Sequence, residues 1–166
     1  AWAHTVFGWV RFNAHKLDAA IAECQRALEL NPSLAFAESI LSISHSWRGD
    51  HDDALKHAKM AERLSPRDPV QSMWSFARTC TEFGIEHYEE AVACAKKTAE
   101  GMPDFPGNLR YLAASLGHLG QRDEARETIA QLLAVTPKDN LQLIRANFPS
   151  VQPERMERFA EGLCKA

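Results

Sequence analysis

The sequence has no long apolar run and no leader-like start, and these two absences narrow its location first. No stretch approaches the roughly 18 consecutive apolar residues that a helix needs to span a bilayer. The chain also does not open with a basic segment followed by an apolar one, as secretion signals do. We therefore expect a soluble, cytoplasmic protein that does not insert into a membrane.

Signatures of catalysis and of metal binding are also missing. There is no G-x-S-x-G and no glycine-rich phosphate loop, and the eight glycines fall mostly at turns and helix ends. Neither H-E-x-x-H nor a Cys/His finger spacing occurs, and the evenly spaced His45, His51 and His57 belong to two expected helices and the turn between them. We predict no catalytic residue, no metal site and no cofactor in this chain.

The chain carries little net charge and few cysteines. Its 19 Lys and Arg residues are scattered among 22 Asp and Glu residues, which gives a formal net charge of -3. A nucleic-acid-binding protein usually shows a basic stripe, so we expect no direct nucleic-acid binding. The four cysteines form no C-x-x-C pair and are interpreted as reduced, buried thiols, which behave as small apolar residues.

The sequence does contain a fourfold repeat. Four prolines are separated by 34, 37 and 34 residues, and each stands 12 residues after an alanine that follows an acidic or small pair. The prolines are Pro32, Pro66, Pro103 and Pro137, and the alanines are Ala20, Ala54, Ala91 and Ala125. Apolar residues recur between them at helical spacing. The pattern predicts four helix pairs over residues 1–32, 35–66, 69–103 and 106–137, followed by a C-terminal segment over 138–166.

The helix boundaries follow from turn residues and caps. The spacing predicts helices over 1–13 and 17–30 in the first repeat and over 34–48 and 52–64 in the second. The three extra residues of the third repeat are expected in the inter-helix turn around Phe83–His87. A final helix over 153–165 has a polar outer face and is expected to cap the end of the stack.

These repeats resemble the tetratricopeptide repeat (TPR) consensus over nearly all of residues 1–137. The match lies in two leucines and in small, turn and helix-ending residues: Gly8, Ala20, Ala27, Pro32, Leu41, Gly49, Ala54, Ala58, Ala61, Pro66, Ala91, Ala95, Pro103, Leu112, Gly120, Ala125 and Pro137. The resemblance implies an all-α, right-handed α-solenoid of about four TPR helix pairs with a C-terminal capping helix. Arrays of this kind usually bind other proteins on a concave face.

The last residues carry a second resemblance. Residues 153–166 look like the C-terminal end of certain bacterial signalling proteins, in which such repeats follow a cyclase catalytic domain or a winged-helix domain. The chain also opens at Ala1 inside an apolar helical pattern. Together these features are interpreted as the C-terminal fragment of a larger bacterial signalling or regulatory protein.

The resemblance also implies a binding surface, since the first helix of each TPR pair lines the concave face. By register the groove residues are Trp9, Phe12, Phe36, Ser39, Ile43, Trp47, Val70, Met73, Ala77 and Arg110. Trp and Met suit adaptable contacts with a partner. A half-repeat error in register would instead place these residues in the core, or the C-terminal helix would cover them. Only Arg110 is basic, so we expect no tight binding of acidic peptide C-termini.

The predicted function is a non-catalytic protein-interaction or regulatory module. Its partner would be a protein or peptide, which includes an upstream domain of its own chain or a sister protomer. The alternative is a homo-oligomerisation or structural spacer domain without an external ligand. A third interpretation is an array packed on a catalytic domain that lies outside this sequence.

Overall fold

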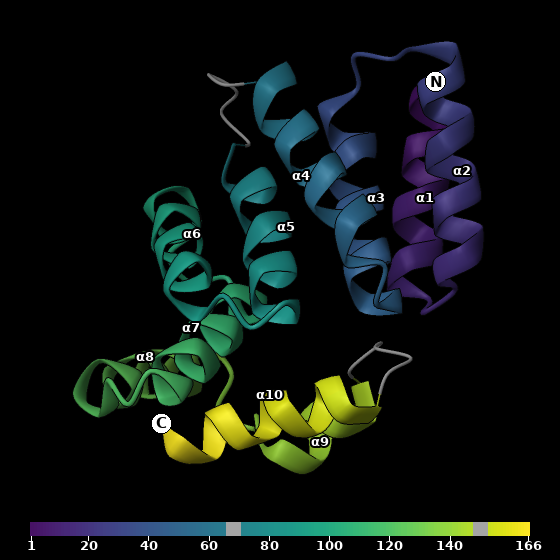
Figure 1. The fold of residues 1–166 in the computed structure, drawn as a ribbon. Helices are drawn as coiled ribbons and strands as arrows, with labels where there is room; N and C mark the ends of the chain where they lie inside the picture. The colour runs from purple at the N-terminus through teal and green to yellow at the C-terminus, as the bar shows by residue number, and fades with distance from the viewer. Residues whose placement is uncertain (66–70, 148–152) are drawn as a thin grey trace.

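The structure is a computed structural model and describes residues 1–65, 71–147 and 153–166. The regular secondary structure of these residues is entirely helical (Figure 1). The helices are α1 (Trp2–Asn13), α2 (Leu17–Leu30), α3 (Ala35–Arg48), α4 (His51–Leu64), α5 (Gln71–Gly84), α6 (Tyr88–Gly101), α7 (Pro106–His118), α8 (Arg122–Val135), α9 (Leu141–Asn147) and α10 (Pro153–Lys165). The predicted all-α fold is therefore confirmed. Within the described part of the chain, no helix has the length and apolar character to cross a membrane.

The first eight helices form four pairs that stack in chain order. Each first helix (α1, α3, α5, α7) packs against the second helix of its own pair, and α3, α5 and α7 also pack against the second helix of the preceding pair. Successive first helices touch one another as well. Figure 1 shows α1 and α2 at one end of this stack and α7 and α8 at the other. The architecture is a helical solenoid, in which each pair contacts mainly its neighbours.

Small residues let the two helices of each pair approach closely. A Cβ atom on Gly8 of α1 would lie only 2.4 Å from the Sγ atom of Cys24 in α2. Near the start of each second helix stands an alanine that is completely buried: Ala20, Ala54, Ala91 and Ala125. The repeated alanine of the sequence is therefore a packing position, where a larger side chain would force the pair apart.

The inter-helix turn of the third repeat has an ordinary length, which corrects one expectation: residues 85–87 separate α5 from α6, as 14–16 and 119–121 separate the helices of the first and fourth pairs. In each turn one residue has a left-handed backbone, five positions before the buried alanine: His15, Gly49, Glu86 and Gly120. The turn around Phe83–His87 is therefore not longer than the others. The extra length of the third repeat lies in the connection between α4 and α5, residues 65–70, whereas the corresponding connections are 31–34 and 102–105. Because these connections join successive pairs, the extra residues leave the geometry inside the third pair unchanged.

The C-terminal helix α10 crosses the ends of the repeats instead of continuing their stack (Figure 1). It packs mainly on α7, and two glycines bring the helices into backbone contact. A Cβ atom on Gly117 would lie 2.0 Å from the carbonyl oxygen of Gly162, and one on Gly162 would lie 2.4 Å from that of Ala114. The aromatic ring of Phe159 is buried at 1% exposure against Tyr111, with ring centroids 4.9 Å apart. Helix α10 therefore docks onto the last pair as an integral part of the fold.

Candidate functional site

A cavity of about 690 Å³ opens between the first helices of all four pairs. Its lining is mainly aromatic and aliphatic: Trp9, Phe12, Asn13, Trp47, Met73, Phe76, Met102, Phe105, Pro106, Gly107, Arg110, Tyr111, Asp139, Leu143, Ile144 and Phe159. These residues come from α1, α3, α5 and α7, from the segment that precedes α7, from the connection between α8 and α9, and from α9 and α10. We call this cavity, together with the smaller one described next, the groove.

The smaller cavity, of about 470 Å³, continues the groove toward the start of the first helices. Trp9 and Met73 line both cavities, so the two are adjoining parts of one apolar surface. Trp2, Phe36 and Trp74 complete its aromatic wall. An apolar concave surface of this size, with few polar groups, is the usual form of a binding site.

Aromatic contacts hold the walls of the groove in place. The rings of Trp9 and Phe12 stack with centroids 5.6 Å apart, and the rings of Phe12 and Trp47 lie 4.4 Å apart. The indole Nε1 of Trp47 donates a hydrogen bond to the hydroxyl of Tyr111 over 3.1 Å. This bond joins α3 to α7 across the intervening α5, so the curvature of the groove is fixed by side chains on non-adjacent repeats.

The charged groups of the larger cavity form a pair. The guanidinium of Arg110 donates to the carboxylate of Asp139 over 2.7 Å, and the Asp139 side chain is only 3% exposed. The carboxylate compensates the positive charge of Arg110, so the groove presents a mainly apolar surface. A site of this kind suits an apolar segment better than a terminal carboxylate, which needs uncompensated donors.

The C-terminal helices close part of the groove. Leu143 and Ile144 of α9 and Phe159 of α10 line the larger cavity. Behind Phe159, the guanidinium of Arg155 is buried at 1% exposure and donates to the carbonyl oxygen of Cys80 over 2.8 Å, as well as to the carbonyl and hydroxyl of Ser46. These acceptors lie in the C-terminal halves of α5 and α3, where the helix dipole favours a cation. The groove is therefore partly filled by its own chain and partly open.

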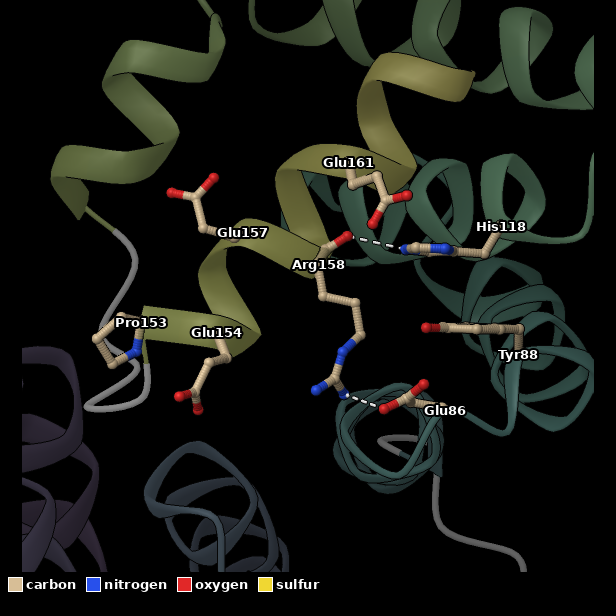
Figure 2. A pocket seen from close by; sticks show the side chains of 8 residues that line it. All are labelled: Glu86, Tyr88, His118, Pro153, Glu154, Glu157, Arg158 and Glu161. Carbon is tan, nitrogen blue, oxygen red and sulfur yellow. Dashed lines mark hydrogen bonds and ion pairs between the residues drawn. The ribbon is translucent and has the colours of Figure 1, made fainter.

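A different hollow, of about 790 Å³, lies between α10, α7 and the α5–α6 turn (Figure 2). Arg158 extends across it, with Nη1 3.1 Å from Oε1 of Glu86, and it also donates to the carbonyl of Gly84 over 3.2 Å. The Nε2 atom of His118 lies 2.8 Å from the carbonyl oxygen of Arg158, and its ring stacks on Tyr88 with centroids 4.4 Å apart. These contacts fasten α10 to the array, so we assign this hollow a structural role.

The structure separates the ten residues predicted for the groove into three groups. Five line the larger cavity, namely Trp9, Phe12, Trp47, Met73 and Arg110, and Phe36 lines the smaller one. Ser39, Ile43 and Ala77 are buried at 2%, 2% and 0% exposure and lie in the core, away from the cavity lining. Val70 lies outside the described residues. The inner helices have neighbours on both sides, which leaves a narrower accessible strip than the one that the register predicts.

Three further residues that line the groove were not predicted from the sequence. Phe105 stands in the connection before α7, and Phe76 and Tyr111 lie on the inner helices α5 and α7. The ring of Phe76 packs edge-on against those of Phe105 and Tyr111, at 4.7 Å and 6.1 Å. The sequence shows that these residues are aromatic. Assigning them to the groove also requires the orientation of each helix about its axis, which the sequence does not give.

His45 and His57, two of the three evenly spaced histidines, make local contacts with carboxylates. The Nδ1 atom of His45 lies 3.1 Å from Asp50, and Nδ1 of His57 bonds Glu38. The rings of His45 and His57 stack with centroids 5.4 Å apart. Within the described ranges, no three His, Cys, Asp or Glu side chains come together in a way that could hold a metal ion. We assign these histidines to the packing between α3 and α4.

The chain matches no protein-family model and no curated protein. Its fold is similar to that of TTC0263, a thermophilic TPR protein of Thermus thermophilus, with 19% identity, a TM-score of 0.72 and coverage of 99% of this chain and 91% of that one. A crystal structure of MamA has 17% identity and a TM-score of 0.65, with coverage of 98% of this chain and 90% of that one. The predicted TPR solenoid is therefore confirmed, and at these identities the likeness concerns the fold.

Proposed function

We propose that this chain is a protein-interaction module that binds an apolar segment of a partner protein in the groove. The observation that supports the proposal most strongly is the groove itself, an accessible surface that is lined by aromatic side chains together with Met73 and Met102. Aromatic residues and Met are enriched at the centres of protein interfaces, and hot spots cluster in such pockets. The proposal assigns no catalytic role to any residue.

The chemistry of the groove favours a particular kind of partner segment. The Arg110 side chain is engaged by Asp139, whereas Trp9 and Met73 contribute apolar surface to both cavities. We infer that the partner inserts aromatic or aliphatic side chains, and that an acidic C-terminus is a poor ligand. Met73 is a suitable central contact because its flexible thioether adapts to different side chains.

Selection of peptides from a random display library on the full chain would test this function. We expect apolar, aromatic-containing peptides, and we expect Met73→Ala to weaken their binding about tenfold, since one half-buried side chain contributes on the order of 1–2 kcal/mol. Fluorescence polarisation with a labelled selected peptide measures the change in Kd.

Met60→Ala is the matched control, because Met60 lies on α4, outside the lining of the groove, beside Arg63. It should leave the Kd within about twofold of the parent value. If the selection returns no binder, or if the binders are equally insensitive to Met73→Ala and Met60→Ala, the groove is not the binding site and the proposal is wrong.

A further inference from the structure

The buried guanidinium of Arg155 in α10 has only uncharged hydrogen-bond acceptors among the residues that the structure describes. It donates to the carbonyl and hydroxyl oxygens of Ser46 and to the carbonyl oxygen of Cys80, and its Nε atom is buried without a partner in the described part of the chain. The dipoles of these helix ends offset the charge of Arg155 in place of a carboxylate. A second positive charge beside this guanidinium would therefore weaken the docking of α10.

One titratable group stands next to Arg155. His51 is the first residue of α4, and Gly84 is the last residue of α5. A Cβ atom on Gly84 would lie 2.8 Å from Nη1 of Arg155 and 3.3 Å from Cε1 of His51. The guanidinium and the imidazole thus approach the same point, which is left open because residue 84 has no side chain.

The surroundings of His51 disfavour its protonated form. Its Nδ1 atom is buried and has no hydrogen-bond partner within the described ranges, whereas an imidazolium donates from both ring nitrogens. The ring also stands at the positive, N-terminal end of α4. Burial, followed by the charges of Arg155 and Arg158, lowers the pKa of His51, and the opposing effect of Asp50 and Asp52 does not reverse this.

The two carboxylates beside His51 in the sequence compensate it poorly. Asp50 bonds the side chains of both His45 and Arg48, so its charge is already shared. Asp52 is exposed, and the surrounding solvent screens its charge. A proton on His51 would therefore act mainly on the cations of α10.

We propose that the protonation state of His51 controls the docking of α10, so that a proton on this ring favours release of the helix from the ends of α3 and α5. Proton binding and docking oppose each other, and linkage requires that acid favour the released form. Release would move Phe159 away from Tyr111 and remove part of the groove wall. As a means of regulating binding, this control rests on the proposed function of the groove, whereas the release of α10 can be measured on the chain alone.

Amide exchange of the full chain at about pH 7.5 and 5.5, on either side of the usual pKa of histidine, tests the proposal. Exchange is corrected for its intrinsic pH dependence, and protection of residues 153–165 is divided by that of α2, which packs on α1 and α3, so that global unfolding cancels. We expect this ratio to fall about fivefold on acidification of the parent. In His51→Asn and His51→Gln, whose side chains do not titrate, it should stay within about twofold.

His15→Asn is the matched control. His15 is an exposed residue of the turn between α1 and α2, and its left-handed backbone suits asparagine. This variant should show the same fall as the parent. His118 also touches α10, but its Nε2 atom lies 2.8 Å from the carbonyl oxygen of Arg158 (Figure 2). A neutral or a charged ring can donate to that oxygen, so the titration of His118 keeps this contact.

Three results would overturn the proposal. The first is a parent chain in which α10 and α2 lose protection equally, because α10 would then not be released locally. The second is a fall in His51→Asn and His51→Gln as large as that of the parent. The third is loss of the effect in His15→Asn, since His51 would then not be its specific source. No peptide is present in these measurements, so a peptide selection that fails and refutes the proposed function leaves their result unchanged.

Discussion

The backbone contact between α7 and α10 makes Gly117→Ala a sharp test of how the C-terminal helix docks. In an isolated helix this change would stabilise, since alanine is favoured over glycine by about 1 kcal/mol. Here the new Cβ atom would lie 2.0 Å from the carbonyl oxygen of Gly162. Ordinary van der Waals contact begins near 3.4 Å, so the two helices would have to separate by roughly 1 Å or more.

That separation would also disturb the anchors of α10. Overpacking a close contact costs about 1–3 kcal/mol, and displacing the buried guanidinium of Arg155 weakens charge-assisted hydrogen bonds worth about 1.5–3 kcal/mol each. These two costs outweigh the gain in helix propensity, and we expect the free energy of unfolding to fall by about 2 kcal/mol. For a chain of this length such a loss lowers the unfolding midpoint by about 4–8 °C.

Thermal unfolding by circular dichroism and amide exchange of residues 153–165 measure the global and the local effect. Gly101→Ala is the matched control, because its Cβ would meet only the side chain of Ser72, which can rotate away. We expect the control to keep the parent midpoint within about 2 °C. If Gly117→Ala melts at or above the parent temperature and α10 exchanges as slowly as before, the inferred docking geometry is wrong.

Two further predictions concern titratable groups. Burial, followed by the charges of Arg155 and Arg158, lowers the pKa of His51 below its usual 6.5. As the pH falls, the unfolded state therefore binds a proton at His51 before the folded state does. The contribution of His51 to the free energy of unfolding is fully present above about pH 6.5 and declines below it. Between about pH 7.5 and 5.5, urea denaturation should show a smaller loss of unfolding free energy for His51→Asn than for the parent. An equal loss would contradict a lowered pKa of His51. Burial raises the pKa of the Cys24 thiol to about 12, whereas Cys164 is exposed; an Ellman assay near pH 8 should show a fast phase that Cys164→Ser removes, and a fast phase that survives would be a contradiction.

The sequence predicted the helices well because each boundary has a local cause. Leu17–Leu30 and Pro153–Lys165 agree with the predicted ranges, since proline and turn residues act on the backbone within a few positions. The placement of the extra residues in the third repeat failed. Length alone does not distinguish a turn inside a pair from a connection between pairs, and only the left-handed residue Glu86 shows that the turn is of ordinary length.

The groove was harder to predict, because whether a residue lines it depends on the rotation of each helix about its axis and on the helices packed beside it. Trp9 belongs to the terminal pair and is accessible, whereas its counterpart Ile43 has neighbours on both sides and is 2% exposed. The insertion of Arg155 under α3 and α5 had no signal in the sequence, where the residue is one of several charges on an amphipathic helix. Origin as part of a larger bacterial signalling protein stays a prediction.

Helix α10 connects the docking of the C-terminal segment with the shape of the groove. Phe159 is at once an anchor of α10, packed on Tyr111, and part of the groove wall. A ligand that contacts Phe159 therefore binds only the docked form of α10 with full affinity, and linkage requires that it stabilise the docked form by the same factor. Because Tyr111 also accepts the hydrogen bond from Trp47, the same ring connects α10 to the opposite wall. The shape of the groove thus depends on the C-terminal helix as well as on the repeats, although no residue of α10 belongs to the repeat pattern.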